Sequence, residues 1–294
     1  MLILLLATLV AQTPPDSVVA RVRATITPFA DTAGARAAGF APLGGRRFQD
    51  GTPFQGIHWI SLRRFLASDG ANLAEPSFLM YAPSPTGLRL VGAAYSRRIG
   101  HEEAPPEGIG GAAAEWHLHQ ACFSIPGIGL ALADGTEDCL VRGGKPTPKQ
   151  TAMVHVWLQP NPDGPFGHDN VELPFNALGI DPAIVDHQLV RPLGVALGEV
   201  VGFRLPYVKR LDVITEGNAL RSPIDRHRLS LASVAEALRT CRPGACQAIA
   251  EEAVAHGDSL RSLYDRLAPT AEFREQMDRQ FEAAVRGPEH HHGH

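Results

Sequence analysis

Residues 77–95 are Ser-Phe-Leu-Met-Tyr-Ala-Pro-Ser-Pro-Thr-Gly-Leu-Arg-Leu-Val-Gly-Ala-Ala-Tyr. The runs 77–82 and 88–95 are rich in aromatic and branched side chains, which favour β-strands. The segment between them contains two prolines and ends at Gly87, which is typical of a turn. We therefore expect two strands joined by a turn, within a mainly antiparallel sheet.

Similar short runs lie on both sides of this stretch, separated by proline and glycine. They predict further strands at 56–62, 114–123 and 152–158, and with them a β-rich domain over residues 39–190. The preceding segment, residues 12–38, is expected to hold a helix and a linker. Its apolar residues Val18, Val22 and Ile26 have the spacing of one helix face.

The hydrophobic period becomes helical after Leu229, and residues 191–294 are expected to be mainly helical. The capping-box pattern Ser233-Val-Ala-Glu236 predicts a helix start. Turn residues predict breaks at Pro243-Gly244 and at Gly257-Asp258, and a last helix from Pro269-Thr270 to about residue 285. The expected fold class is α+β: a mainly antiparallel β domain, sandwich or barrel-like, followed by a small C-terminal region of three or four short helices.

The first residues indicate export. Residues 2–10 are apolar except for Thr8, a run too short for a membrane-spanning helix of about 20 residues. We interpret residues 1–11 as a signal peptide, with Ala11 before the cleavage point. No later stretch reaches 18 apolar residues, so no membrane span is expected in the mature chain. The small residues at every fourth position of 194–202 indicate close helix packing within a soluble domain.

Composition and charge exclude several classes of protein. Apolar residues make up 44% of the 294 residues and charged residues 20%, which excludes a disordered tail protein or a coiled coil. The net charge is −4 and no block of five or six like charges occurs, so nothing indicates a nucleic-acid partner.

Four cysteines agree with an oxidising compartment. They are Cys122, Cys139, Cys241 and Cys246. Four cysteines allow three pairings, and two local bridges, Cys122 with Cys139 and Cys241 with Cys246, are the simplest. Free buried thiols are the alternative.

The most informative feature is the placement of the histidines, because each of the three tryptophans has one beside it or two residues away. The segments are His58-Trp59, Trp116-His117-Leu118-His119 and His155-Val156-Trp157. Residues i and i+2 of a strand share a face, so His117 and His119 project together, about 6 to 7 Å apart. With His58 and His155 on neighbouring strands, the pattern predicts a zinc or copper site.

Two further residues are candidates for handling protons at that site. Glu115 shares the face of the histidine pair and is a candidate ligand, ligand partner or general base. His168 follows the turn-rich segment 161–167, which is either a plain loop or a loop that brings His168, Asp169 and Asn170 to the histidine cluster. The tail, 289–294, has four histidines and is expected to be flexible, either binding metal loosely or being an expression remnant.

The combined segments resemble a group of uncharacterised exported bacterial proteins. The resemblance covers about residues 39–178 and is carried by Gly-x-His-Trp at 56–59, Trp-His-x-His-x-x-Cys at 116–122 and His-Val-Trp-x-x-Pro-Asn-Pro-Asp-Gly-x-Phe at 155–166. It implies export and a histidine-bearing sheet domain. It implies no reaction, because no activity is established for that group.

Three classes of function follow from these residues. The leading hypothesis is an extracytoplasmic protein that binds copper or zinc through His58, His117, His119 and His155. Three ligands and a water favour instead a metal-dependent enzyme, a hydrolase or oxidoreductase, with Glu115 or His168 handling protons. The third hypothesis is a structural or carbohydrate-binding module, which requires exposed tryptophans.

Overall fold

The structure, a computed structural model, describes residues 15–44, 52–84, 86–106, 108–125, 129–133, 135–141, 143–203, 208, 211, 219–242 and 244–286. The predicted signal peptide, 1–11, and the histidine-rich tail, 289–294, lie outside the described residues. Within the described ranges, no helix is both long enough and apolar enough to cross a membrane.

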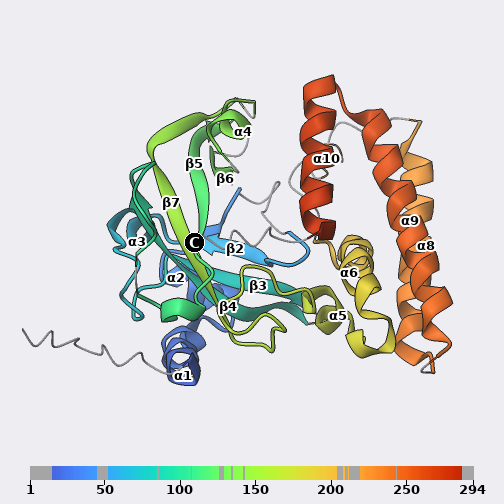
Figure 1. The fold of residues 1–294 in the computed structure, drawn as a ribbon, viewed down its shortest axis with the longest axis horizontal. Helices are drawn as coiled ribbons and strands as arrows, with labels where there is room; N and C mark the ends of the chain where they lie inside the picture. Colours follow the sequence, from blue (N-terminus) through green and yellow to red (C-terminus); the bar gives the residue numbers. More distant parts are fainter. Residues whose placement is uncertain are drawn as a thin grey trace, which may run out of the picture.

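The sheet is antiparallel and curved into a half-barrel (Figure 1). Its strands are β1 (Ala41–Pro42), β2 (Ile57–Ile60), β3 (Phe78–Ser84), β4 (Gly87–Ile99), β5 (His117–Ile125), β6 (Gly129–Ala133) and β7 (Lys145–Trp157), in the spatial order β1-β2-β3-β4-β7-β5-β6. Every neighbouring pair is antiparallel. The expected pair of strands is confirmed, and the chain turns between Ser84 and Gly87, within the predicted turn at 82–87, so that β3 runs two residues further than expected.

Helices flank the sheet and then form a separate group. The first are α1 (Pro15–Ile26), α2 (Thr32–Ala37), α3 (Leu62–Ala67) and α4 (Thr136–Val141); then come α5 (Leu173–Leu178), α6 (His187–Val201), α8 (Arg221–Thr240), α9 (Cys246–Leu267) and α10 (Ala271–Arg286). Short 3₁₀ turns are at Thr27–Phe29, Gly111–Ala113 and Pro182–Ile184. Figure 1 shows α5 and α6 between the sheet and the long helices α8 and α9, with α10 above α6. The α+β class is therefore confirmed.

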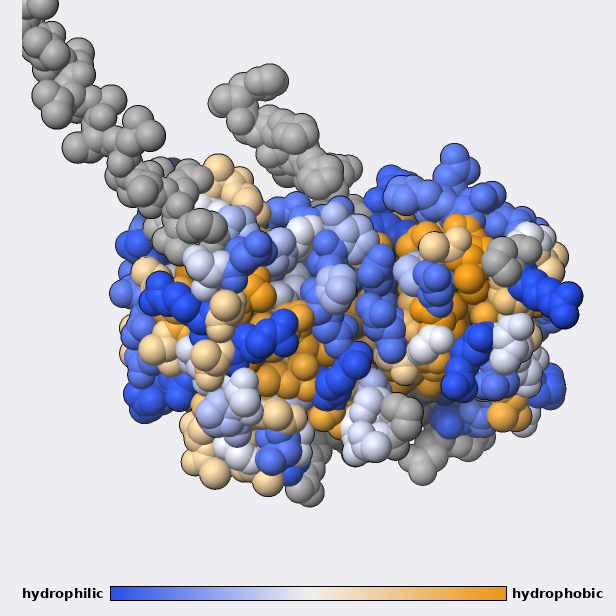
Figure 2. Space-filling view, turned by 90° about the horizontal axis from the view of Figure 1, so that it is seen from below, coloured by the Kyte–Doolittle hydropathy of each residue, from blue (hydrophilic) through white to orange (hydrophobic). Residues whose placement is uncertain are grey.

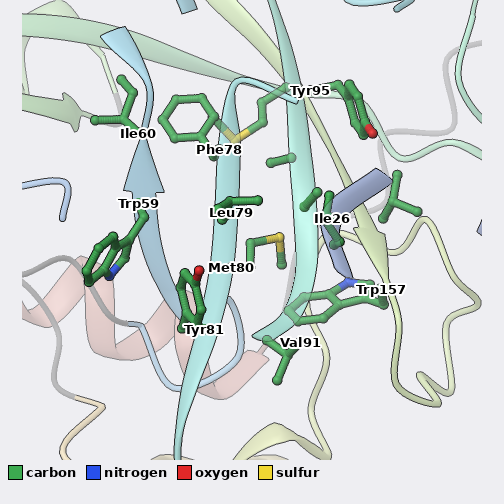
Figure 3. Close-up of a cluster of buried hydrophobic side chains, with 14 of the residues drawn as sticks. Ile26, Trp59, Ile60, Phe78, Leu79, Met80, Tyr81, Val91, Tyr95 and Trp157 are labelled. Carbon is green, nitrogen blue, oxygen red and sulfur yellow. The ribbon is translucent and has the colours of Figure 1, made fainter. Parts of the chain in front are cut away.

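Two hydrophobic cores hold these parts together. In the sheet core, Trp59 and Tyr81 lie side by side, as Figure 3 shows, and their ring centroids are 5.4 Å apart. Ile26 of α1 belongs to the same core. Val18, Val22 and Ile26 are buried, which confirms the predicted first helix. The second core is formed by α5, α6 and the long helices. On the face drawn in Figure 2, hydrophilic and hydrophobic residues are interspersed.

The long helices differ from the prediction in two places. α8 begins at Arg221, and Ser233 lies inside it, where its hydroxyl donates to the carbonyl of Leu229 at 3.2 Å instead of capping a new helix. α9 continues through Gly257 without a break. A Cβ at Gly257 would lie 3.0 Å from the Cβ of Ala196, so this glycine permits close contact between α6 and α9. The helices are consequently longer than expected.

Other predictions for this region are confirmed. The chain breaks between α8 and α9 near Gly244, and Thr270 caps α10 by accepting a hydrogen bond from the amide of Phe273. Gly194 and Gly198 of α6 lie against Phe54 and Pro53, because a Cβ at Gly194 would be 2.7 Å from the Phe54 ring. The small-residue pattern therefore serves close packing.

Two disulfides join neighbouring elements. Cys122 of β5 is bonded to Cys139 of α4, and Cys241, at the end of α8, is bonded to Cys246, the first residue of α9. These are the two local bridges expected from the sequence. The second one fastens α8 to α9 across the turn that separates them.

Candidate metal centre

Strand register places the predicted histidines on one face of the sheet. His117 and His119 of β5 pair with Met153 and Thr151 of β7. Paired residues share a face, and so do residues two apart on one strand, so His117, His119 and His155 lie on the same side. The pairings across β3 and β4 add His58 to this face.

The segment after β7 folds back over this face and brings His168 to it. His155 donates from Nδ1 to the carbonyl oxygen of His168 at 2.6 Å. Trp157 donates from its indole nitrogen to the carbonyl of Gly167 at 2.7 Å and from its backbone nitrogen to the carbonyl of Pro165 at 2.8 Å. The loop is therefore fixed to the strand that precedes it, and it does reach the histidine cluster.

Three histidines converge closely enough to hold one metal ion. One ring nitrogen from each of His117, His119 and His168 lies within 4.8 Å of the other two, and all three side chains are partly buried. The ring centroids of His117 and His168 are 3.9 Å apart, and those of His117 and His119 are 4.9 Å apart. The sequence predicted the first two as ligands and His168 as a candidate catalytic residue.

His117 has the chemistry of a metal ligand. Its Nδ1 lies 3.3 Å from the carbonyl oxygen of Glu115, which can only accept, so Nδ1 carries the hydrogen and Nε2 carries the lone pair. That Nε2 atom is buried and has no hydrogen-bond partner among the described residues. Burial, followed by the nearby His168, His155 and His119, holds the pKa of His117 well below the usual histidine range. The ring is therefore neutral, as metal binding requires.

His58 and His155 form a second, deeper pair beside these three. Their Nε2 atoms are 3.3 Å apart, and both side chains are buried. Burial, followed by His58 and His168, holds the pKa of His155 well below its usual range. Because Nδ1 of His155 donates to His168, its Nε2 accepts from His58, and both ring nitrogens of His155 are engaged. The structure brings this pair next to the three histidines but not into the group that converges within 4.8 Å.

A shell of polar groups holds His168 in place. Oε2 of Glu115 accepts from the backbone nitrogen of His168 at 2.7 Å. Nε2 of Gln55 lies 2.9 Å from Nε2 of His168 and donates to Oδ1 of Asp169 at 3.2 Å. An amide nitrogen can only donate, so this contact occupies the lone pair of His168 Nε2, and His168 can bind an ion only after Gln55 moves away or turns its amide oxygen toward this nitrogen. Asp169 also forms an ion pair with Arg191 of α6, with Nη2 and Oδ2 2.7 Å apart and both side chains largely buried. Metal-binding histidines are commonly fixed by such outer partners.

Gln55 and Arg191 were not predicted from the sequence. Gln55 lies 113 residues before His168, in no recognisable motif, and Arg191 belongs to a helix whose position depends on tertiary packing. The proximity of His168 itself was one of two interpretations of its loop. Glu115 is expected from the sequence as a ligand, a partner of a ligand or a general base, and in the structure its carboxylate accepts a hydrogen bond from the backbone nitrogen of His168.

The tryptophans of the cluster serve the core. Trp59 and Trp157 are each 1% exposed. Trp116 is partly buried and packs against the sheet core. Trp59 and Trp157 cannot line an exposed platform for a carbohydrate, the arrangement that the binding-module hypothesis requires.

Comparison with known proteins gives no guide to the chemistry of this site. No protein-family model matches the chain, and neither the curated proteins nor the solved structures that were searched include a significant match.

Proposed function

We propose that this protein is an exported metal-binding protein that holds one zinc or copper ion through His117, His119 and His168. The observation that carries the proposal is the convergence of three ring nitrogens, one of which, Nε2 of His117, is buried without a partner in the described part of the chain. Burying a polar atom without a hydrogen bond costs about 1 to 3 kcal/mol, and a bound ion would remove that cost.

The ligand type supports zinc or copper. Neutral imidazoles suit both ions, whereas magnesium and calcium prefer oxygen ligands. Export is supported by the two disulfides, which persist in oxidising compartments, and by the predicted signal peptide. His155 lies next to the three ligands, with its ring centroid 4.8 Å from that of His117, but both of its ring nitrogens already have partners, so the fourth position is left for water or another ligand.

A metal-dependent enzyme is the second candidate, favoured by one specific observation. A cavity of about 600 Å³ has Glu115 in its wall, the residue that holds the backbone of His168. Three histidine ligands leave a fourth position for water or substrate, as in hydrolytic zinc sites. In this case Glu115 is the candidate base at the edge of the cavity.

Calorimetric titration with zinc chloride and with copper(II) sulfate tests the proposal. The protein should be a full-length variant in which His290, His291, His292 and His294 are serine, so that the tail contributes no imidazole. We expect one ion bound per chain, and a loss of affinity of at least about 100-fold in His117→Asn. His256→Asn, a change on α9, is the matched control and should bind normally. Equal binding by His117→Asn and the control would contradict the proposal.

A further inference from the structure

The cavity beside the metal centre has the size of a small-molecule site. Its volume is about 600 Å³, within the range of about 300 to 1,000 Å³ that ligand pockets occupy. Its wall is formed by Glu115 before β5, the loop after β7, the segment around Asp181, the first turns of α6 and Arg286 at the end of α10. It therefore lies where the sheet, its covering loop and the helices meet.

The charges in this wall are mainly negative. Four carboxylates line the cavity: Glu115, Asp163, Glu172 and Asp181. Among the described residues, no Lys, Arg or His side chain forms an ion pair with any of them. The wall also contains His187 and two arginines. Arg191 pairs with Asp169, and Arg286 forms an exposed pair with Glu282. The cavity therefore has an excess of negative charge.

The protonation behaviour of Glu172 agrees with this excess. Partial burial, followed by the nearby charge of Asp181, raises the pKa of Glu172 above its usual value. A cation placed between these two carboxylates would relieve both effects, because it would neutralise charge that the protein leaves uncompensated.

A bare metal ion is the wrong size and shape for these carboxylates. In the described part of the chain, the only group of three or more potential ligands that converges within 4.8 Å is the histidine group. The four carboxylates are instead distributed around a wall that also contains Val171, Pro182, Val185 and Val190. Such a wall suits a cation with a hydrocarbon portion, because apolar surface and a charged end can be bound together.

We propose that this cavity binds an organic ammonium ion, with the amine near Glu172 and Asp181 and the hydrocarbon portion against the valines. The proposal rests on the proposed function where it names a ligand for the metal centre. Glu115 and Arg191 connect the two sites, because they line the cavity and also hold His168 and Asp169. The binding itself requires only the cavity.

Titration of the full chain with three six-carbon probes tests the inference. The probes are hexylamine, 1-hexanol and hexanoate, which share the hydrocarbon portion and differ in charge. We expect hexylamine to bind at least about ten-fold more tightly than hexanol, because a charged hydrogen bond is added, and hexanoate to bind most weakly. Equal affinity for hexylamine and hexanol, or tighter binding of hexanoate, would overturn the inference.

Variants of the cavity wall test whether hexylamine binds at the proposed carboxylates. Glu172→Gln combined with Asp181→Asn should weaken hexylamine binding at least about ten-fold and leave hexanol binding unchanged, because shape is kept and charge is removed. Glu236→Gln, an exposed carboxylate on α8, is the control and should bind hexylamine as the wild type does. Unchanged hexylamine affinity in the double variant, with its unfolding temperature equal to that of the wild type, would place the amine elsewhere and overturn the inference.

The same titration can distinguish failure of the amine proposal from failure of the metal proposal. The titration is made on protein treated with a chelator and again on zinc-loaded protein. Hexylamine binding to the metal-free chain supports the cavity assignment even if no zinc binds. Zinc binding without selective hexylamine binding overturns the cavity assignment alone.

Discussion

Glu115 shows how one residue can position two of the converging histidines, one through its carboxylate and the other through its backbone carbonyl. It accepts from the backbone nitrogen of His168, while its own carbonyl oxygen accepts from Nδ1 of His117. Two of the three converging histidines therefore depend on this residue for their orientation. The sequence pattern predicts Glu115 near the site because it lies two residues before His117 in the expected strand 114–123, but its hydrogen bond to a loop 53 residues away depends on the tertiary fold.

Removing the Glu115 carboxylate tests this positioning role. Glu115→Ala should lower zinc affinity about 10- to 100-fold, the usual effect of losing an outer partner of a metal ligand. The number of ions bound per chain should not change, because no ligand is lost. Competition with a coloured chelator measures the affinity, and Glu102→Ala, a nearby exposed position, is the control. Wild-type affinity in Glu115→Ala would argue against the role.

Arg191 stabilises the fold through its ion pair with Asp169. Its guanidinium pairs with Asp169, whose side chain is only 9% exposed, so Arg191→Met leaves a carboxylate buried without its main cation. We expect a loss of about 2 to 4 kcal/mol in the free energy of unfolding.

The control for this change is Arg239→Met, which removes an exposed ion pair with Glu236 and should cost less than about 1 kcal/mol. Urea unfolding of both variants gives the comparison. A cost for Arg191→Met as small as that of the control would show that the pair does not fix Asp169.

At the scale of elements, α8 and α9 contact each other through a pair of histidines. Nδ1 of His227 lies 3.0 Å from Nδ1 of His256, and His256 also faces Glu252 on its own helix, at 3.9 Å. Burial, followed by the nearby His256 and Arg226, lowers the pKa of His227. Protonation of His227 therefore opposes the contact between the two helices.

His227 makes the free energy of unfolding decrease as the pH falls. A histidine whose pKa is lowered in the folded state is protonated first in the unfolded chain, so stability is lost as the pH falls below about 6.5. His227→Gln should consequently lose less stability than the wild type between pH 7.5 and pH 5.5. Urea unfolding measures the difference, and the two proteins should show parallel behaviour above pH 7.5. A steeper loss in His227→Gln would contradict the assignment.

Helices and strands can be predicted where residue type and spacing determine them locally. They cannot be predicted where contacts with distant residues decide their ends. The strands around 77–95 and the helix at 15–26 follow from residue type and spacing alone. β1 has only two residues and was missed because such a short segment carries no period. The local pattern predicts a helix end at Gly257. In the structure this glycine instead lets α9 pack against Ala196, a residue 61 positions earlier in the chain.

At the scale of the whole molecule, the candidate site combines residues that local sequence patterns predict with residues that only the tertiary fold brings together. His117 and His119 share a face because strand geometry requires it, and the register with β7 adds His155. The path of the loop that carries His168 is set by hydrogen bonds from Trp157 and His155, which no sequence pattern reveals. Gln55 and Arg191 likewise come from distant elements, the latter from the helical part of the molecule.

The central claim is that one ion is held by His117, His119 and His168, and anomalous diffraction at the zinc absorption edge tests it most directly. Crystals of the full-length variant with serine at the four tail histidine positions, grown with zinc chloride, should show one strong anomalous peak. We predict that this peak lies about 2.0 to 2.1 Å from a ring nitrogen of each of these histidines. A zinc peak elsewhere in the molecule, or no peak between these rings, would contradict the account.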